Sequence, residues 1–170
     1  MGKIISIVNQ KGGVGKTTTA VNLGAYLSHL GKDVLLVDVD PQANATSGIG
    51  IDHKNLSHGI YEAIIGEKPI YHVIKHTLED RLKVAPSTAS LAGAGIELVG
   101  MENREYQLAN ILNTIKEEYD YIIIDGPPSL GLLTVNSLVA ADEILIPIQS
   151  EYYALEGLSQ LLHIPYVLHG

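Results

Sequence analysis

The sequence predicts an α/β fold: a mostly parallel sheet of about five strands flanked by helices. Five short runs of branched apolar residues are bounded by turn residues, which is typical of buried parallel strands. Helical patterns lie between these runs, so strands and helices alternate along the chain. A glycine-rich loop joins the first run to the first helical pattern. The predicted strands are residues 3–9, 33–38, 81–85, 121–125 and 143–148.

The first helical pattern covers residues 16–30 and is followed by Gly31, a residue typical of helix C-termini. Residues 44–80 are the least regular part of the sequence. Gly48, Gly50 and Asp52 predict a loop, residues 56–65 a short helix ended by Gly66, and Pro69 a brief turn through residue 74. We expect this part to be mobile surface.

Two more helices are predicted between the third and fourth strands. Residues 87–99 have an Ala/Gly-rich face suited to close packing, and residues 103–119 form a clearer amphipathic pattern with Leu108, Ile111, Leu112 and Ile115 on one side. We expect both helices to cover the sheet.

The glycine-rich loop, residues 10–18, indicates a phosphate site. Its Gly-x-x-x-x-Gly-Lys-Thr spacing between a strand and a helix lets backbone N–H groups surround a phosphate, because glycines allow positive φ and a close approach. Lys16 supplies a charge for the β- and γ-phosphates, and Thr17 a hydroxyl for Mg²⁺ (magnesium). The alternative is a glycine-rich turn without a ligand. The candidate binding residues are Lys11, Gly12, Gly13, Val14, Gly15, Lys16, Thr17 and Thr18.

Two other strand ends carry carboxylates. Asp125 ends an apolar strand. If this strand lies beside the phosphate-loop strand, Asp125 would reach the Mg²⁺ shell as a Walker B aspartate does. The alternative is an ordinary strand end, which is the more common meaning of an apolar run followed by Asp alone. Asp38 and Asp40 lie two positions apart around the end of the second strand. We expect only one of them to face the phosphates, and both could instead merely cap a turn.

The wording KGGVGKTT, with Lys11 as a second lysine, resembles the deviant Walker A ATPases of the ParA/Soj partition type. The resemblance implies a P-loop NTPase-like fold, ATP and Mg²⁺ as ligands, and an ATP-dependent sandwich homodimer. It implies that Lys11 acts on the partner's phosphates and that Asp40 orients the attacking water and contacts the Mg²⁺ shell. The alternative for Lys11 is a solvated side chain beside the loop. The implied role is chromosome or plasmid partitioning, with slow hydrolysis stimulated by a ParB-like partner.

The resemblance covers about residues 2–162, and residues 163–170 do not continue the family's helix. Family members normally continue with further strands and helices. We therefore expect one nucleotide-binding domain, residues 1–170, with a sheet smaller than the family's, one uncovered sheet edge, and none of the basic residues that the family uses for nonspecific DNA binding. One alternative is a catalytically weak or inactive nucleotide-binding or interaction module. Another, a membrane-associated septum-positioning ATPase, is disfavoured by Asp40-Pro41-Gln42.

Composition narrows the function classes. The net charge is −8 and no Lys or Arg follows Lys116, so the last third offers no basic patch for nucleic acid. The absence of cysteine excludes disulfides and iron–sulfur ligation. No apolar run approaches membrane-spanning length, so we expect a cytoplasmic protein, nucleoid-associated by resemblance. His72 and His76 would share one face if their segment were helical, but we expect solvated histidines rather than a metal site.

Overall fold

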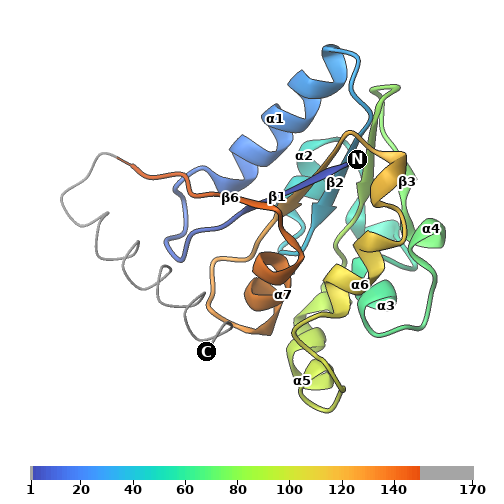
Figure 1. The fold of residues 1–170 in the computed structure, drawn as a ribbon, viewed down its shortest axis with the longest axis vertical. Helices are drawn as coiled ribbons and strands as arrows, with labels where there is room; N and C mark the ends of the chain where they lie inside the picture. The colour runs from blue at the N-terminus through green and yellow to red at the C-terminus, as the bar shows by residue number, and fades with distance from the viewer. Residues whose placement is uncertain (1, 150–170) are drawn as a thin grey trace.

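The computed structural model describes residues 2–149, and a six-stranded sheet lies at its centre (Figure 1). The strand order is β3-β4-β2-β5-β1-β6, and every neighbouring pair is parallel except β3 with β4. The α/β class and the mostly parallel sheet are confirmed. The strands are β1 (Lys3–Ile7), β2 (Val34–Asp38), β3 (Lys75–His76), β4 (Leu82–Ala85), β5 (Tyr121–Asp125) and β6 (Glu143–Leu145).

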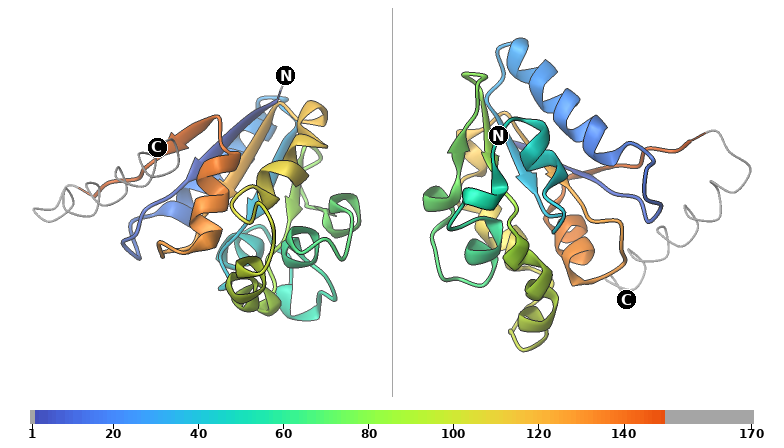
Figure 2. Two further views of the ribbon diagram at one scale, coloured as in Figure 1. Left: turned by 60° about the horizontal axis from the view of Figure 1, so that its bottom comes forward. Right: turned by 180° about the vertical axis from the view of Figure 1, so that it is seen from behind.

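Helices cover both faces of the sheet (Figure 2). Helix α1 packs on one face together with α2, and α3 to α7 lie on the other. The α-helices are α1 (Lys16–His29), α2 (Asn44–Gly48), α3 (Ile60–Ile64), α4 (Ile70–Val73), α5 (Ala94–Val99), α6 (Gln107–Asn113) and α7 (Leu132–Ala140). Three short 3-10 helices are η1 (His53–Asn55), η2 (Ala89–Gly93) and η3 (Lys116–Glu118).

The central strand β2 explains this layering. All of its residues are buried, and successive side chains of a strand point to opposite faces. Leu35 and Val37 join the core beneath α3 to α7, whereas Val34 and Leu36 join the core beneath α1. Burial on both faces requires a continuous apolar run, which is the pattern that this strand shows.

Several predicted elements differ from the structure. The sheet has a sixth strand, β3, whose two residues are too few to produce a periodic pattern. Residues 49–52 lie in no helix or strand, as the predicted loop requires, but residues 44–48 before them form α2, which the sequence did not predict. The predicted helix 103–119 is shorter in the structure: α6 begins at Gln107, after Asn103 with its left-handed φ of 49°, and ends at Asn113, and residues 116–118 form η3.

The segment 44–80 is also less superficial than expected. Its apolar side chains on α3 and α4 lie in the larger core cluster; they are Ile60, Ala63, Ile64, Ile70 and Val73. The prediction of a surface segment is wrong for α3 and α4, whose side chains share a core cluster with those of α6 and β2. These helices are too short to show a clear apolar stripe in the sequence.

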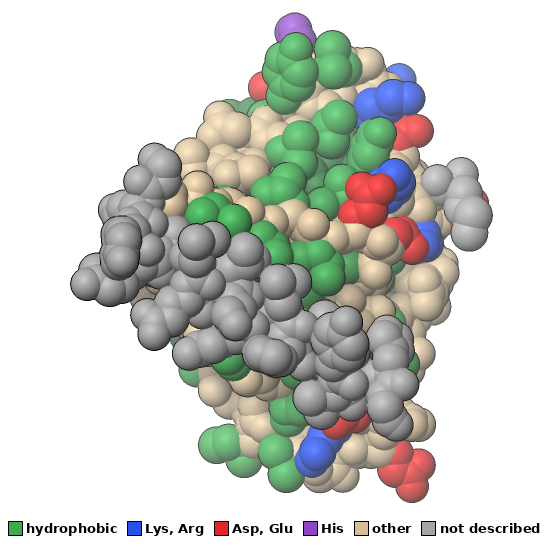
Figure 3. Space-filling view, turned by 60° about the vertical axis from the view of Figure 1, so that its left-hand side comes forward, with side chains coloured by type: hydrophobic (Ala, Val, Ile, Leu, Met, Phe, Trp, Pro, Cys, Tyr) green, Lys and Arg blue, Asp and Glu red, His purple; other side chains and the backbone are tan. Residues whose placement is uncertain are grey.

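Strand β6 lies at the edge of the sheet and pairs with β1 alone among the described strands. The face that carries α1 and β6 displays many hydrophobic side chains (Figure 3). Tyr26 of α1 and Leu30, its C-cap residue, are 63% and 58% exposed, and Ile144 of β6 is 45% exposed. Among residues 2–149, no helix combines the length and apolar character needed to cross a bilayer.

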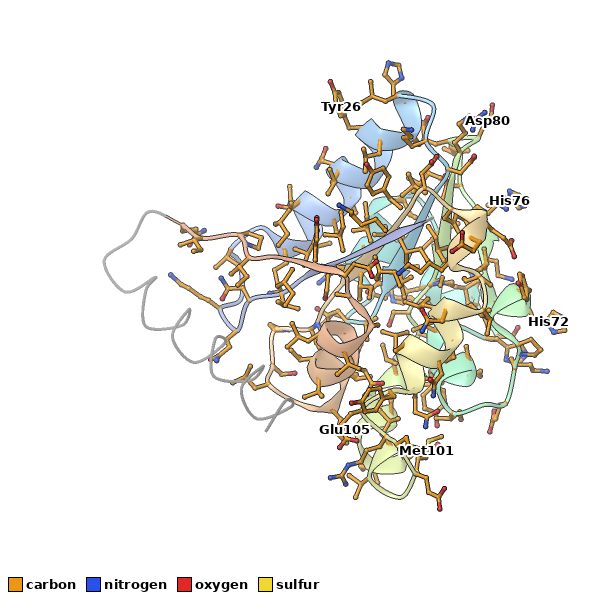
Figure 4. The ribbon with its side chains drawn as sticks, in the orientation of Figure 1. Tyr26, His72, His76, Asp80, Met101 and Glu105 are labelled. Atoms are coloured by element: carbon orange, nitrogen blue, oxygen red, sulfur yellow. The ribbon has the colours of Figure 1, made fainter. Side chains whose placement is uncertain are left out.

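His72 and His76 do not share a helix face. His72 lies on α4, which ends at Val73, and His76 belongs to β3. Both side chains are exposed at the periphery of the molecule (Figure 4). No group of three or more metal-binding side chains of the His, Cys, Asp and Glu types occurs in the described part of the chain.

Candidate functional site

The glycine-rich loop runs from the end of β1 to the first residue of α1. Gly13 and Gly15 have φ angles of 74° and 92°, a left-handed conformation that glycine adopts with little strain. Gly15 is the N-cap of α1, and Cβ atoms added at Gly12, Gly13 or Gly15 would meet no atom within 4 Å. The loop therefore presents open backbone beside a helix N-terminus, where unpaired N–H groups favour an anion.

A cavity of about 510 Å³ lies against this loop. Most of the candidate binding residues line it, together with Asp40. Lys11, Val14 and Asp125 are not in its lining, and Val14 is buried. The lining residues are Gly12, Gly13, Gly15, Lys16, Thr17, Thr18, Asp40, Gln42, Asn44 and Pro128.

Lys16 is held inside the loop. Its side chain is only 6% exposed, and its Nζ donates to the Lys11 carbonyl oxygen at 3.3 Å. Burial lowers the pKa of Lys16, while the nearby charges of Asp125 and Asp40 act in the opposite direction. A desolvated ammonium group in this position interacts strongly with any phosphate that enters the cavity.

Thr17 and Asp125 connect α1 to the end of β5. The Thr17 hydroxyl donates to Asp125 Oδ2 at 2.7 Å. Asp125 is fully buried, and none of the described residues donates a hydrogen bond to its Oδ1. Burial raises the pKa of Asp125 to about 7; the charges of Asp38 and Asp40 also raise it, whereas the Thr17 bond and Lys16 lower it. Through Oδ2, this carboxylate is hydrogen-bonded to Thr17, which itself lines the cavity.

The two aspartates at the end of β2, Asp38 in its last position and Asp40 just beyond it, have different surroundings. Asp38 is fully buried and its Oδ2 accepts from both the backbone N–H and the hydroxyl of Thr46, each at 2.7 Å. Asp40 lines the cavity, and its Oδ1 accepts from the Gln42 backbone N–H at 2.9 Å. Only the second aspartate lines the cavity, because Asp40 lies in the turn beyond the end of β2, where strand geometry no longer sets the direction of its side chain.

Lys11 is exposed at the entry of the loop, and its backbone N–H donates to Asn9 Oδ1 at 3.0 Å. The segment after β6 contacts the same region. Asn9 Nδ2 donates to the Pro147 carbonyl at 2.8 Å, and Gln149 Nε2 donates to the Gly13 carbonyl at 3.1 Å. The part of the family resemblance from residue 150 onward lies outside the described residues.

Sequence reasoning did not single out Gln42, Asn44 and Pro128 as cavity residues. A signal for them exists, because each follows within a few residues of a strand end that carries an aspartate. The carboxyl ends of parallel strands meet at one edge of a sheet, where ligands of open α/β folds bind.

Comparison with known proteins decides the family. A family model described as an AAA domain matches residues 2–168. The sporulation initiation inhibitor protein Soj of Bacillus subtilis is 58% identical over 163 residues, which are 96% of this chain and 64% of that protein. The chain belongs to the ParA/Soj-type partition ATPases of the AAA domain family. It spans slightly less than two thirds of the length of Soj.

Solved structures share the fold of this chain. Cobyrinic acid a,c-diamide synthase from Mycobacterium smegmatis, with bound ADP and magnesium, superposes with a TM-score of 0.92 at 39% identity, covering 96% of this chain and 66% of its own. A putative plasmid partition protein from Borrelia burgdorferi, bound to AMPPNP, superposes with a TM-score of 0.89 at 33% identity. The match covers 100% of this chain and 71% of the Borrelia chain.

Proposed function

We propose that this chain binds ATP with Mg²⁺ in the cavity at the glycine-rich loop and hydrolyses it, as one nucleotide-binding domain over residues 1–170. In this proposal ATP drives formation of a homodimer that acts as a switch in chromosome or plasmid partitioning. The observation that carries the proposal is that Lys16, Thr17 and Asp40 line a single cavity, with Thr17 hydrogen-bonded to the buried Asp125.

The loop and Lys16 bind the phosphates. Open backbone at Gly12, Gly13 and Gly15 admits a phosphate group close to the chain, and the N-terminus of α1 favours its negative charge. Lys16 neutralises the β- and γ-phosphates from within the loop. Because its ammonium group is already buried, little solvent has to be reorganised when a nucleotide enters.

The donor set around Thr17 fits Mg²⁺. This ion prefers hard oxygen ligands, and the site offers the Thr17 hydroxyl together with a buried Asp125 carboxylate that has an unsatisfied oxygen. Asp40 supplies a second carboxylate at the cavity wall. Bound Mg²⁺ would neutralise charge on the phosphates during transfer. In this proposal the Mg²⁺ ion is bound by Thr17, Asp125 and Asp40, directly or through water.

Asp40 and Lys11 complete the proposed reaction. Asp40 accepts a hydrogen bond from the water that attacks the γ-phosphate, and so fixes the orientation of that water. Lys11, exposed at the loop entry, contacts the phosphates bound to the second subunit, as an arginine finger does. Hydrolysis is then slow in the monomer, and a ParB-like partner stimulates it in the dimer. In this proposal the protein is cytoplasmic and acts on the nucleoid.

The experiment is a steady-state ATPase assay on the purified chain and on Lys16→Ala and Asp40→Ala. We expect slow Mg²⁺-dependent hydrolysis in the unmodified chain and a loss of about a hundredfold or more in both variants. Phosphate release that is equally fast in all three proteins contradicts the proposal. Tight nucleotide binding without hydrolysis in the unmodified chain would instead favour the interaction-module alternative.

A further inference from the structure

Both carboxylate oxygens of Asp38 are hydrogen-bonded within the protein. The residue lies outside the cavity lining and is fully buried. Oδ1 accepts from the Asp40 backbone N–H at 3.1 Å, and Oδ2 accepts twice from Thr46 at 2.7 Å. A buried carboxylate is costly unless its oxygens are paired, so this residue requires an explanation that the proposed chemistry does not supply.

Through Thr46 the network reaches a third element. The Thr46 hydroxyl, which donates to Asp38, also accepts from the Ser87 backbone N–H at 3.0 Å. Ser87 lies two residues after the end of β4 and Thr46 belongs to α2, while Asp38 is the last residue of β2. The ends of two neighbouring strands are thus joined through one side-chain hydroxyl in the first turn of α2.

The turn between Asp40 and α2 is strained. Ala43, the N-cap residue of α2, has a φ of 53°, in the left-handed region that residues with a Cβ rarely adopt. Its backbone N–H donates to the Asp40 carbonyl at 2.9 Å, and the side chain is fully buried. Such a conformation persists only where surrounding contacts enforce it. Asp38 bonds to both sides of this turn, at Asp40 and at Thr46.

We infer that Asp38 is a positioning residue for hydrolysis: through Thr46 it enforces the strained turn 40–46 and so keeps the Asp40 carboxylate at the cavity wall. The inference rests on the proposed function, because it concerns the residue assigned to the attacking water. The glycine-rich loop lies on another part of the cavity and needs none of these bonds. Loss of the network should therefore slow hydrolysis much more than it weakens the binding of a diphosphate.

The test compares Thr46→Val with Thr46→Ser in the full chain. Valine has the shape of threonine without the hydroxyl, whereas serine keeps the hydroxyl. We expect Thr46→Val to lower kcat by about tenfold or more, with the affinity for ADP measured without Mg²⁺ changed by less than about threefold. Thr46→Ser should keep kcat within about threefold of the unmodified chain.

Asp38→Asn provides a second variant in case Thr46→Val does not fold, as judged by circular dichroism. An amide of the same size places an N–H₂ group against one of the donors, so we expect the same selective loss of kcat. The inference is wrong if a folded Thr46→Val or Asp38→Asn variant keeps its kcat. It is also wrong if kcat and ADP affinity fall by the same factor, which a purely structural role predicts.

The outcomes separate this inference from the proposed function. If the unmodified chain does not hydrolyse ATP, the proposed function fails, and the positioning role fails with it. If the unmodified chain is active and Asp40→Ala is not, an unchanged kcat in Thr46→Val contradicts only the role of Asp38.

Discussion

The hydroxyl of Thr17 donates a 2.7 Å hydrogen bond to Asp125 Oδ2, although 108 positions separate the two residues in the chain. The pairing arises because β5 lies beside β1 in parallel register, with Asp125 opposite Ile7. The loop that follows β1 then returns Thr17 to the end of β5 in the first turn of α1. One hydrogen bond therefore connects the loop to the strand that supplies the proposed metal-binding carboxylate.

Replacing Thr17 should weaken the contribution of Mg²⁺ to nucleotide binding. Thr17→Val removes the hydroxyl and leaves Asp125 without its donor, so we expect the gain in ATP affinity on adding Mg²⁺ to fall by about tenfold or more. Thr17→Ser, which keeps the hydroxyl, serves as the matched control and should retain most of the gain. Calorimetric titrations with and without Mg²⁺ measure it. Equal gains in the two variants would rule out a role for the hydroxyl.

The buried carboxyl of Asp125 should make the stability of the nucleotide-free protein depend on pH. Burial raises its pKa to about 7, whereas an aspartate in an unfolded chain has a pKa of about 3.9. Between these values the folded state retains a proton that the unfolded state has released. The free energy of unfolding of the protein therefore falls as the pH rises from about 4 to about 7, because folding then requires this carboxyl to take up a proton.

Asp125→Asn tests this sign. The uncharged amide should raise the free energy of unfolding by about 2 kcal/mol at pH 8 and by less than about 1 kcal/mol at pH 4, as measured in urea without nucleotide. Asp80→Asn makes the same chemical change at an exposed position on the surface (Figure 4) and is the control. A stabilisation of equal size at pH 4 and pH 8 would contradict the buried-carboxyl explanation.

Alanine substitutions at Gly15 and Gly12 should have opposite effects on stability. Gly15 has a φ of 92°, so Gly15→Ala should cost about 1–2 kcal/mol even though the added methyl group meets no neighbour. Gly12 lies outside the left-handed region and also has open space, so Gly12→Ala should be neutral or stabilise by about 0.5 kcal/mol. Chemical unfolding of both variants provides the comparison. A Gly12→Ala variant as unstable as Gly15→Ala would show that steric contact, not φ, decides the effect.

Mixing two inactive variants tests whether Lys11 acts across the proposed dimer. Lys11→Ala and Asp40→Ala should each lower hydrolysis by about a hundredfold or more when assayed alone. In a mixed dimer, one site combines an intact Asp40 with an intact Lys11 of the second subunit, so mixing should restore part of the rate. If Lys11 acts within its own subunit, no mixed dimer has a complete site and the activity stays low.

The sequence allowed the central strands and the loop to be predicted because their signals are local. The apolar runs of β1, β2, β4 and β5 are bounded by turn residues, and the glycine spacing has a direct steric meaning. These features depend on a few neighbouring residues. Strand alternation does not explain why only Asp40 lines the cavity, because side chains two positions apart share a face; β2 ends at Asp38, and Asp40 lies in the turn beyond it.

The missed features depend on contacts between distant parts of the chain. Helix α2 has five residues and ends with Gly48, so its sequence favours a loop. Two hydrogen bonds hold it in place: Thr46 donates to Asp38, and the Ser87 backbone N–H donates to the Thr46 hydroxyl. The short strand β3 exists only because β4 pairs with it. The place of Asn44 in the cavity likewise follows from the turn at Ala43, whose left-handed φ no local pattern predicts.

The most direct measurement is a calorimetric titration of ATP with Mg²⁺ into the chain and into Lys16→Ala. We predict a single site with a dissociation constant of about 1–100 μM in the unmodified chain and binding weakened by about a hundredfold or more in the variant, because Lys16 is the buried charge at the cavity. Equal affinity in the two proteins, or no binding to the folded unmodified chain, would contradict a nucleotide site at the glycine-rich loop.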